Sequence, residues 1–163
     1  MKKIDFVVGI IVALLILSPA GISFAWQETE ISSKVRLPTN IEIIQPSPDL
    51  PKNVAAFSGR WEGVWESDLA CVLVVEKIYP YKREMIAEVV YAWGYHAWGK
   101  EDYIRRKAKI RGPRPRLEFS SSYAEMEFEM AEDGSLNGTH DFFSRSGPYR
   151  PLTKAKIKMY KVE

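Results

Sequence analysis

The sequence is poor in the residues that most often carry chemistry. Its 163 residues include a single cysteine, Cys71, and two histidines, His96 and His140. One thiol cannot form an intramolecular disulfide, so the chain has no disulfide framework. Two histidines and one cysteine, well separated in the sequence, make no recognisable zinc site. Cys71 lies in the run L-A-C-V-L-V-V, which indicates a small buried hydrophobic side chain, with a reactive thiol or an intermolecular bridge as the alternative.

Charge and sequence motifs argue against further classes of function. The formal net charge is only +2, and basic and acidic residues are interspersed, so no large field of one sign predicts binding to nucleic acid. Neither G-x-x-x-x-G-K-S/T nor G-x-G-x-x-G occurs, so nucleotide binding has no support. The nucleophile motif G-x-S-x-G is also missing. We therefore expect a non-enzymatic protein without a cofactor or a metal.

The first 25 residues have the three-part pattern of a secretory signal peptide. Lys2 and Lys3 precede an uncharged run of twelve residues, Phe6 to Leu17, and small residues at a cleavage site end at Ala25. We therefore expect a periplasmic or extracellular protein whose mature chain starts near Trp26. A retained membrane anchor is the alternative. A spanning helix needs about 20 apolar residues, and this stretch reaches that length only by including a charge, a proline and a glycine.

Residues 26–56 are predicted to be an extended linker. They contain four prolines and follow neither the helical nor the strand period. Proline removes a backbone donor and disfavours helix in the residue before it. The core of the segment, S-P-D-L-P-K-N, is typical of a semi-rigid spacer. The strand-like island Ile41–Ile44 could instead dock on the folded domain as an edge strand.

From residue 57 onward the chain reads as short strands. The stretch Phe57 to Glu66 places Trp61, Gly63 and Trp65 on one side, because strand side chains alternate with a period of two. Seven further segments of this kind follow, none of them helical: 69–78, 83–93, 103–111, 116–120, 124–130, 136–143 and 153–162. Short strands joined by hairpin turns predict an all-β domain over residues 57–163, an antiparallel up-and-down barrel of about eight strands. Closure would leave no sheet edge exposed.

The start of the first strand resembles a known family. Gly59-Arg60-Trp61 is similar to the G-x-W signature of lipocalins and the wider calycin group. In that family the tryptophan fills the closed end of an eight-stranded barrel, so the resemblance implies that Gly59 and Trp61 form a structural plug. The stretches W-E-G-V-W, V-V-Y-A-W-G and D-G-S-L-N-G resemble small exported bacterial barrel domains of poorly known function. The chain is short for a lipocalin, and short strands make a small barrel filled by its own side chains.

An aromatic loop and one arginine supply the candidate ligand contacts. The loop W-G-Y-H-A-W-G favours a rim around a ligand mouth, because Trp and Tyr combine apolar area with one polar handle, or else a hairpin that caps the barrel. Arg106 shares the parity of the apolar residues Ile104 and Ala108, and a buried charge there must be paired. Its guanidinium suits an anionic ligand such as a fatty-acid carboxylate, unless a bulge rotates it outward. The predicted ligand-binding residues are Tyr91, Trp93, Tyr95, His96, Trp98 and Arg106.

The remaining titratable residues have plainer explanations. His140 and Asp141 are neighbours on a strand and therefore point to opposite faces, so we interpret His140 as a buried structural residue and not a catalytic base. The densest positive charge lies on residues 105–116, and the acidic row Glu125, Glu127 and Glu129 is at most two strands away. Cross-strand pairing between these rows explains both. An anionic partner on the surface of the cell envelope is the alternative.

Two hypotheses for function follow. The first is an exported, non-enzymatic β-barrel that binds a small apolar or amphipathic molecule at the aromatic loop. The second is a structural or interaction module of the cell envelope, with the linker as a spacer and the basic strand as a docking face. An internal cavity of at least a few hundred cubic ångströms, about the scale of ligand pockets, would favour the first hypothesis. A barrel packed solid would favour the second.

Overall fold

A computed structural model describes residues 30–95, 100–121, 124–143 and 151–162. Two short helical turns come first, η1 (Ser32–Lys34) and α1 (Lys52–Ala55), and eight strands follow. The strands are β1 (Gly59–Trp65), β2 (Ala70–Tyr81), β3 (Glu84–Trp93), β4 (Asp102–Arg111), β5 (Arg116–Ser120), β6 (Ala124–Met130), β7 (Leu136–Phe143) and β8 (Pro151–Val162). The predicted signal peptide lies outside the described residues.

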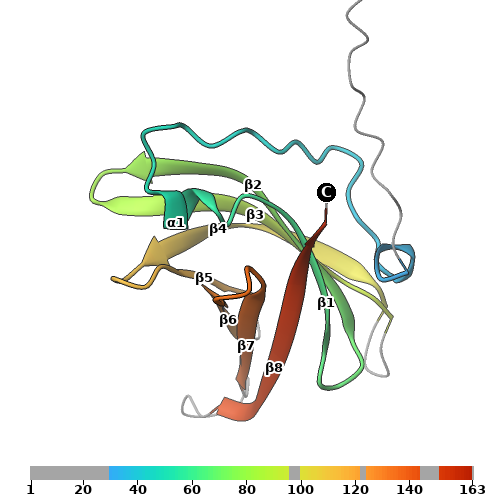
Figure 1. Cartoon of the computed structure of the whole chain (residues 1–163). Helices are drawn as coiled ribbons and strands as arrows, with labels where there is room; N and C mark the ends of the chain where they lie inside the picture. The colour runs from blue at the N-terminus through green and yellow to red at the C-terminus, as the bar shows by residue number, and fades with distance from the viewer. Residues whose placement is uncertain (1–29, 96–99, 122–123, 144–150, 163) are drawn as a thin grey trace, which may run out of the picture.

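The eight strands form one closed antiparallel barrel (Figure 1). Each strand pairs with the next along the chain, and β8 pairs with β1 to complete the ring. The prediction of an all-β, eight-stranded, up-and-down barrel is confirmed. The predicted turn at residues 79–82 is too long, because β2 continues to Tyr81 and Pro80 lies opposite Met85 in the ladder. Proline is tolerated near the end of a strand, and Lys82 makes the tight turn with a left-handed φ of 56°.

Close backbone approach explains two glycines on the inner face of the barrel. A Cβ atom on Gly63 would lie 2.5 Å from the carbonyl oxygen of Lys158 on β8. A Cβ atom on Gly138 would lie 2.6 Å from both Phe128 and Ile157. Any larger side chain at either position would push a neighbouring strand or ring away. The two glycines therefore leave room for the inner side chains of Phe128, Ile157 and Met159.

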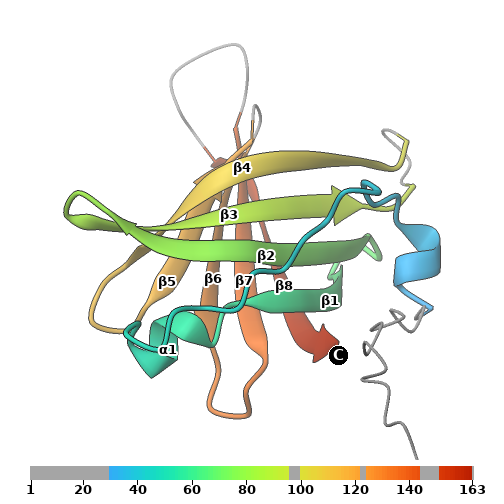
Figure 2. The ribbon, with the colours of Figure 1, turned by 90° about the horizontal axis from the view of Figure 1, so that it is seen from above.

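Trp61 lies at the end of the barrel where β1 begins. Its side chain is 1% exposed, and its Nε1 donates to the carbonyl oxygen of Phe57 at 2.8 Å. Val54 of α1 and Phe57 belong to the same buried cluster, and Figure 2 shows α1 beside the start of β1. Gly59 has a φ of 118°, a left-handed value that L side chains rarely adopt, where the chain enters β1. The G-x-W stretch thus links the short helix to the barrel wall.

The predicted linker is extended, and it also packs against the barrel. Figure 1 shows residues 30–56, which we call the strap, running along β2 and β3. Apolar strap residues, Val35 foremost, contact a buried patch on the outer face of these strands. The patch consists of Val72, Val74, Val90 and Ala92, with Ile31, Leu37, Ile41 and Ile43 of the strap packed against it. This cover explains why β2 is apolar on both faces.

The stretch Ile41–Ile44 docks where β2 extends past β1. The pairing of β1 with β2 ends at Gly59 and Val75, and the ladder between β2 and β3 shifts register between Val75 and Lys77. The residue at this irregularity, Glu76, accepts the backbone N–H of Ile44 on its carbonyl oxygen at 2.7 Å. A bulge leaves backbone groups out of the strand ladder, and here the strap bonds one of them.

A buried ion pair lies on the outer face of β1. Arg60 and Glu62 are only 7% and 3% exposed, and Arg60 Nη2 lies 2.6 Å from Glu62 Oε1. Arg60 also borders a small surface depression with Leu37 and Ile41 of the strap. Strand alternation places both side chains on the outer face of β1. It does not predict that they are buried, because their burial depends on which other segments cover that face. Removing one partner would leave a buried charge uncompensated.

Replacing Trp61 with alanine should lower the free energy of unfolding by about 3–5 kcal/mol, because a fully buried ring is lost and a cavity remains. Urea denaturation followed by far-UV circular dichroism measures the change. Tyr160→Ala on neighbouring β8 is the control, because Tyr160 is 59% exposed and its loss should change stability by less than about 0.5 kcal/mol. An unchanged melting temperature for Trp61→Ala would show that the ring is no structural plug.

Candidate functional site: the open flank between β4 and β5

β5 pairs with only one end of β4. They share three residue pairs, from Lys109 opposite Glu118 to Arg111 opposite Arg116. β3, by contrast, pairs with β4 from Asp102 to Ile110. Figure 2 shows β4 and β5 diverging. Within the described part of the chain, residues 102–108, which we call the β4 edge, therefore have a strand neighbour on one side only.

Aromatic rings line the interior beside this flank. Tyr91 of β3 is buried and Trp93 is half-buried, with ring centroids 6.1 Å apart. Tyr91 also contacts Phe119 of β5 at 5.8 Å, and Phe119 stacks on Phe128 of β6 at 6.0 Å. Phe119 was missed in the sequence analysis, although its alternation with Leu117 on a short strand indicated an inward position. The rings of β3, β5 and β6 thus form one continuous row.

The hydroxyl of Tyr91 is already bonded inside the barrel. Trp65 Nε1 donates to Tyr91 OH at 2.8 Å and to Cys71 Sγ at 3.1 Å, and the Cys71 and Tyr91 side chains are themselves 3.1 Å apart. Burial raises the pKa of Cys71 to about 12 and the pKa of Tyr91 well above its usual range. Both groups are therefore neutral at physiological pH. This cluster ties β1, β2 and β3 together.

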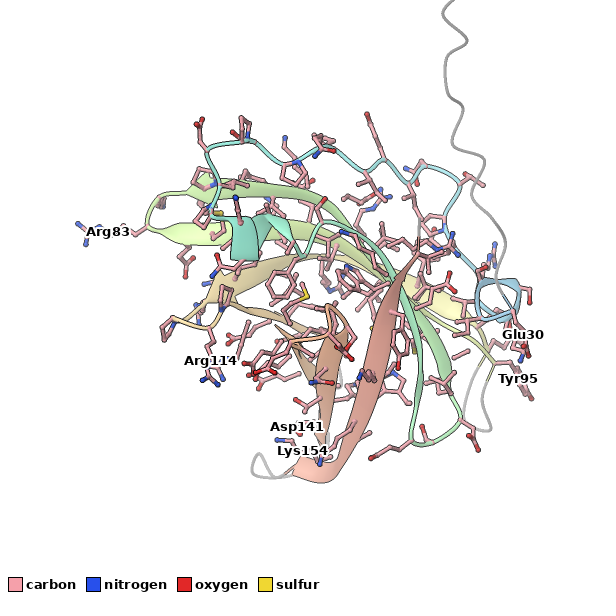
Figure 3. All side chains as sticks on the ribbon, in the orientation of Figure 1. Glu30, Arg83, Tyr95, Arg114, Asp141 and Lys154 are labelled. Atoms are coloured by element: carbon pink, nitrogen blue, oxygen red, sulfur yellow. The ribbon has the colours of Figure 1, made fainter. Side chains whose placement is uncertain are left out.

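The predicted aromatic rim is only partly described. Tyr95 is 75% exposed, and Figure 3 shows its side chain pointing away from the barrel. His96 and Trp98 lie outside the described residues. Of the six predicted ligand-binding residues, the structure brings together Tyr91 and Trp93, and it places Arg106 on the neighbouring strand. Whether this group binds a ligand stays a prediction.

Arg106 has the predicted parity but is not buried. It lies opposite Val89, a core residue, so it belongs to the inner row of β4. The register between β3 and β4 is continuous, so no bulge rotates it. Its side chain is nevertheless exposed, because β4 has separated from β5 at this point and the inner row reaches water. Arg106 Nη1 donates to the carbonyl oxygen of Arg105 at 3.1 Å.

His140 lies on the inner row of β7, close to Trp65 of β1. It is opposite Met126 and Ala155, and its ring is 5.3 Å from Trp65. Burial lowers its pKa to about 4, and the nearby charge of Asp141 opposes this shift only weakly. The ring is therefore neutral at physiological pH, which suits a packing role better than proton transfer.

Most of the basic strand is neutralised by glutamates. Glu84 on β3 pairs with Lys109 at 2.8 Å and with Arg111 at 3.0 Å, and both bonds lower its pKa. Arg105 pairs with Glu76, Arg116 with Glu127, and Arg111 also approaches Glu118. The partners thus come mainly from β2, β3 and β5, and only Glu127 belongs to the predicted acidic row. Among the described residues, Arg106, Lys107 and Arg114 take part in no ion pair.

Two surface depressions stand out among the described residues. The larger, about 730 Å³, is open to solvent and is lined by Lys107 and Lys109 of β4 and by Asp141 and Lys154, which Figure 3 labels close to each other. Its other lining residues are Arg111, Glu118, Phe119, Ser120, Glu125, Met126, Glu127 and Thr139. Charges of both signs dominate this lining. The smaller depression, about 170 Å³, lies beneath the strap. Neither depression is a pocket inside the barrel.

The described residues show neither a metal site nor a membrane-spanning helix. No group of three His, Cys, Asp or Glu residues in the described ranges is arranged to hold a metal ion. Within the same ranges, no helix has the length and apolar character needed to cross a membrane. The β4 edge with its aromatic neighbours therefore remains the most distinctive surface feature.

The fold defines a class of protein. The chain forms a closed, eight-stranded, antiparallel barrel, an architecture consistent with lipocalin-like and calycin-like proteins. Comparisons with protein-family models, curated proteins and solved structures found no match for this chain.

Burial of the Cys71 thiol predicts that it is inert in the folded protein. With its pKa raised to about 12, it holds almost no thiolate at neutral pH, and the thiolate is the reactive form. Ellman's reagent should therefore label the native protein very slowly and the urea-unfolded protein completely. Rapid labelling of the native protein would contradict the buried Trp65–Cys71–Tyr91 cluster.

The lowered pKa of His140 predicts acid sensitivity. The folded protein protonates this ring only near pH 4, whereas an unfolded chain does so near pH 6.5. The unfolded state therefore binds more protons below pH 6.5, and stability falls as the pH drops toward 4. Urea unfolding at about pH 7 and about pH 4.5 should show a smaller loss for His140→Gln than for the natural protein. Equal losses would mean that another group causes the acid sensitivity.

Proposed function

We propose that this protein is an exported, non-enzymatic interaction module of the cell envelope that works through the outside of its barrel. The observation that carries the proposal is the packing of the interior. Every one of the eight strands contributes buried side chains to a single core cluster. These include Trp61, Leu73, Val89, Ile110, Leu117, Phe128, Leu136 and Met159. A ligand inside this barrel would have to displace some of these buried side chains.

The N-terminal region supports the proposed export of the protein and the attachment of its strap to the barrel. The pattern of residues 1–25 favours export, and the strap continues from there onto the outer face of β2 and β3. The start of the described chain is therefore fastened to the barrel wall. The Gly59-Arg60-Trp61 stretch at the start of β1 supports a lipocalin-like ancestry for the barrel itself.

A small amphipathic ligand is the second candidate. The row of Trp93, Tyr91 and Phe119 lies at the open flank, and Arg106 is exposed on the same inner row. A ligand could lie across the flank with its carboxylate on Arg106 and its apolar part against Trp93. Such a ligand would sit at the mouth of the barrel and not within its core.

Native mass spectrometry of the protein purified from its own envelope separates the two candidates. We expect the mass of the bare chain, together with an envelope association that weakens between about 50 mM and about 500 mM NaCl, because salt screens surface charges. Trp93→Ala is the control, and it should leave the association unchanged. A co-purifying amphiphile that disappears in Arg106→Ala would favour the second candidate and overturn the first.

A further inference from the structure

We propose that the β4 edge binds an acidic, extended peptide segment of a partner protein as an added strand. The inference rests on the proposed function of the protein as an interaction module and names its class of partner. It starts from an irregularity in an otherwise closed barrel. β4 spans Asp102–Arg111, whereas β5 spans only Arg116–Ser120, so most of β4 has no strand on that side within the described residues.

An edge of this kind presents backbone groups that need hydrogen-bond partners. Two groups on the β4 edge are bonded by side chains of the same strand. Asp102 Oδ1 accepts the backbone N–H of Tyr103 at 2.8 Å, and Arg106 Nη1 donates to the carbonyl oxygen of Arg105 at 3.1 Å. Both are exposed local bonds, so an incoming strand could replace them with ladder hydrogen bonds at little cost. The edge, residues 102–108, is about 20 Å long, which suits a typical strand.

The charge available at this edge is positive. Arg106 on the inner row and Lys107 on the outer row are both exposed, and neither takes part in an ion pair among the described residues. Further along the strand, Lys109 and Arg111 are already held by Glu84. Side chains directly opposite in neighbouring strands lie about 5 Å apart, and opposite charges there stabilise the pairing. A partner strand with adjacent carboxylates would meet Arg106 on one face and Lys107 on the other.

The same charges argue against a second copy of this chain as the partner. Pairing two β4 edges would bring together two clusters of Arg105, Arg106 and Lys107, and like charges in opposed strands are destabilising. Inward-pointing charges such as Arg106 are a known means of preventing edge-to-edge association. Two β4 edges should therefore repel each other, whereas an acidic strand should be attracted to the β4 edge.

The test uses the full chain and a synthetic peptide, acetyl-Thr-Glu-Glu-Val-Glu-Glu-Thr-amide. We expect it to slow amide hydrogen exchange within residues 102–108 and to shift the NMR signals of those amides. A peptide with lysine in place of each glutamate should bind at least about tenfold more weakly, since each tenfold step is only about 1.4 kcal/mol. Binding of the acidic peptide should also weaken as salt is added.

The double variant Arg106→Glu, Lys107→Glu should lose at least about tenfold in affinity for the acidic peptide. Its matched control is Lys52→Glu, Arg114→Glu, which makes the same change of charge at two exposed residues outside the β4 edge. Far-UV circular dichroism and the melting temperature check that both variants fold. Equal binding of the two peptides, equal binding by the two variants, or amide changes outside the edge would overturn the inference.

Envelope association of the same two variants separates this inference from the proposed function. If the edge variant associates with the envelope as well as its control does, the edge is not the docking surface, although the proposed function stands. If the natural protein shows no association at all, the proposed function fails. The peptide measurements then test by themselves whether the β4 edge binds an acidic strand.

Discussion

The pairing of β1 with β8 is the interaction on which the rest of the structure depends. It turns a meander of eight strands into a ring and brings the inner side chains of all eight together. A ring of short strands encloses little space, and Trp61 and Trp65 of β1 are buried in it. Closure is achieved only because Gly63 and Gly138 lack side chains where Lys158, Phe128 and Ile157 come close. The buried core lies inside the ring, and the interaction surface that we propose lies on its outside.

Strands of unequal length create that surface. β2 extends past β1, and the strap fills the difference by bonding to Glu76 at the irregularity and by covering the apolar outer face of β2 and β3. β4 extends past β5, and in the described residues no strand fills that difference. The two mismatches have the same cause, since a ladder can pair only as far as its shorter strand. The strap compensates for the first mismatch, whereas the second leaves residues 102–108 without a strand on one side within the described part of the chain.

Only part of the positive charge on β4 is paired with glutamates. Lys109 and Arg111 pair with Glu84, and Arg105 of the β4 edge pairs with Glu76. Where β4 separates from the barrel, Arg106 and Lys107 remain exposed without an ion pair among the described residues. The buried Cys71 and Tyr91 and the half-buried His140 are all held neutral by desolvation. Among the described residues, the β4 edge offers two exposed cations without an ion pair and a row of backbone groups.

Local pattern alone determined the number of strands, most of their limits and which residues face inward, because alternation with a period of two is a property of each strand by itself. It placed Trp61 and Trp65 inside and put Arg106 on the inner row. Tertiary structure decided what alternation cannot express: that the strap lies on the barrel, that Arg60 and Glu62 are buried on an outer face, that Phe119 joins the rings of Tyr91 and Trp93, and that Arg106 reaches water. Each of these features depends on contacts between segments far apart in the chain or on the length of one strand relative to its neighbour. The alternation within a single strand contains no information about either.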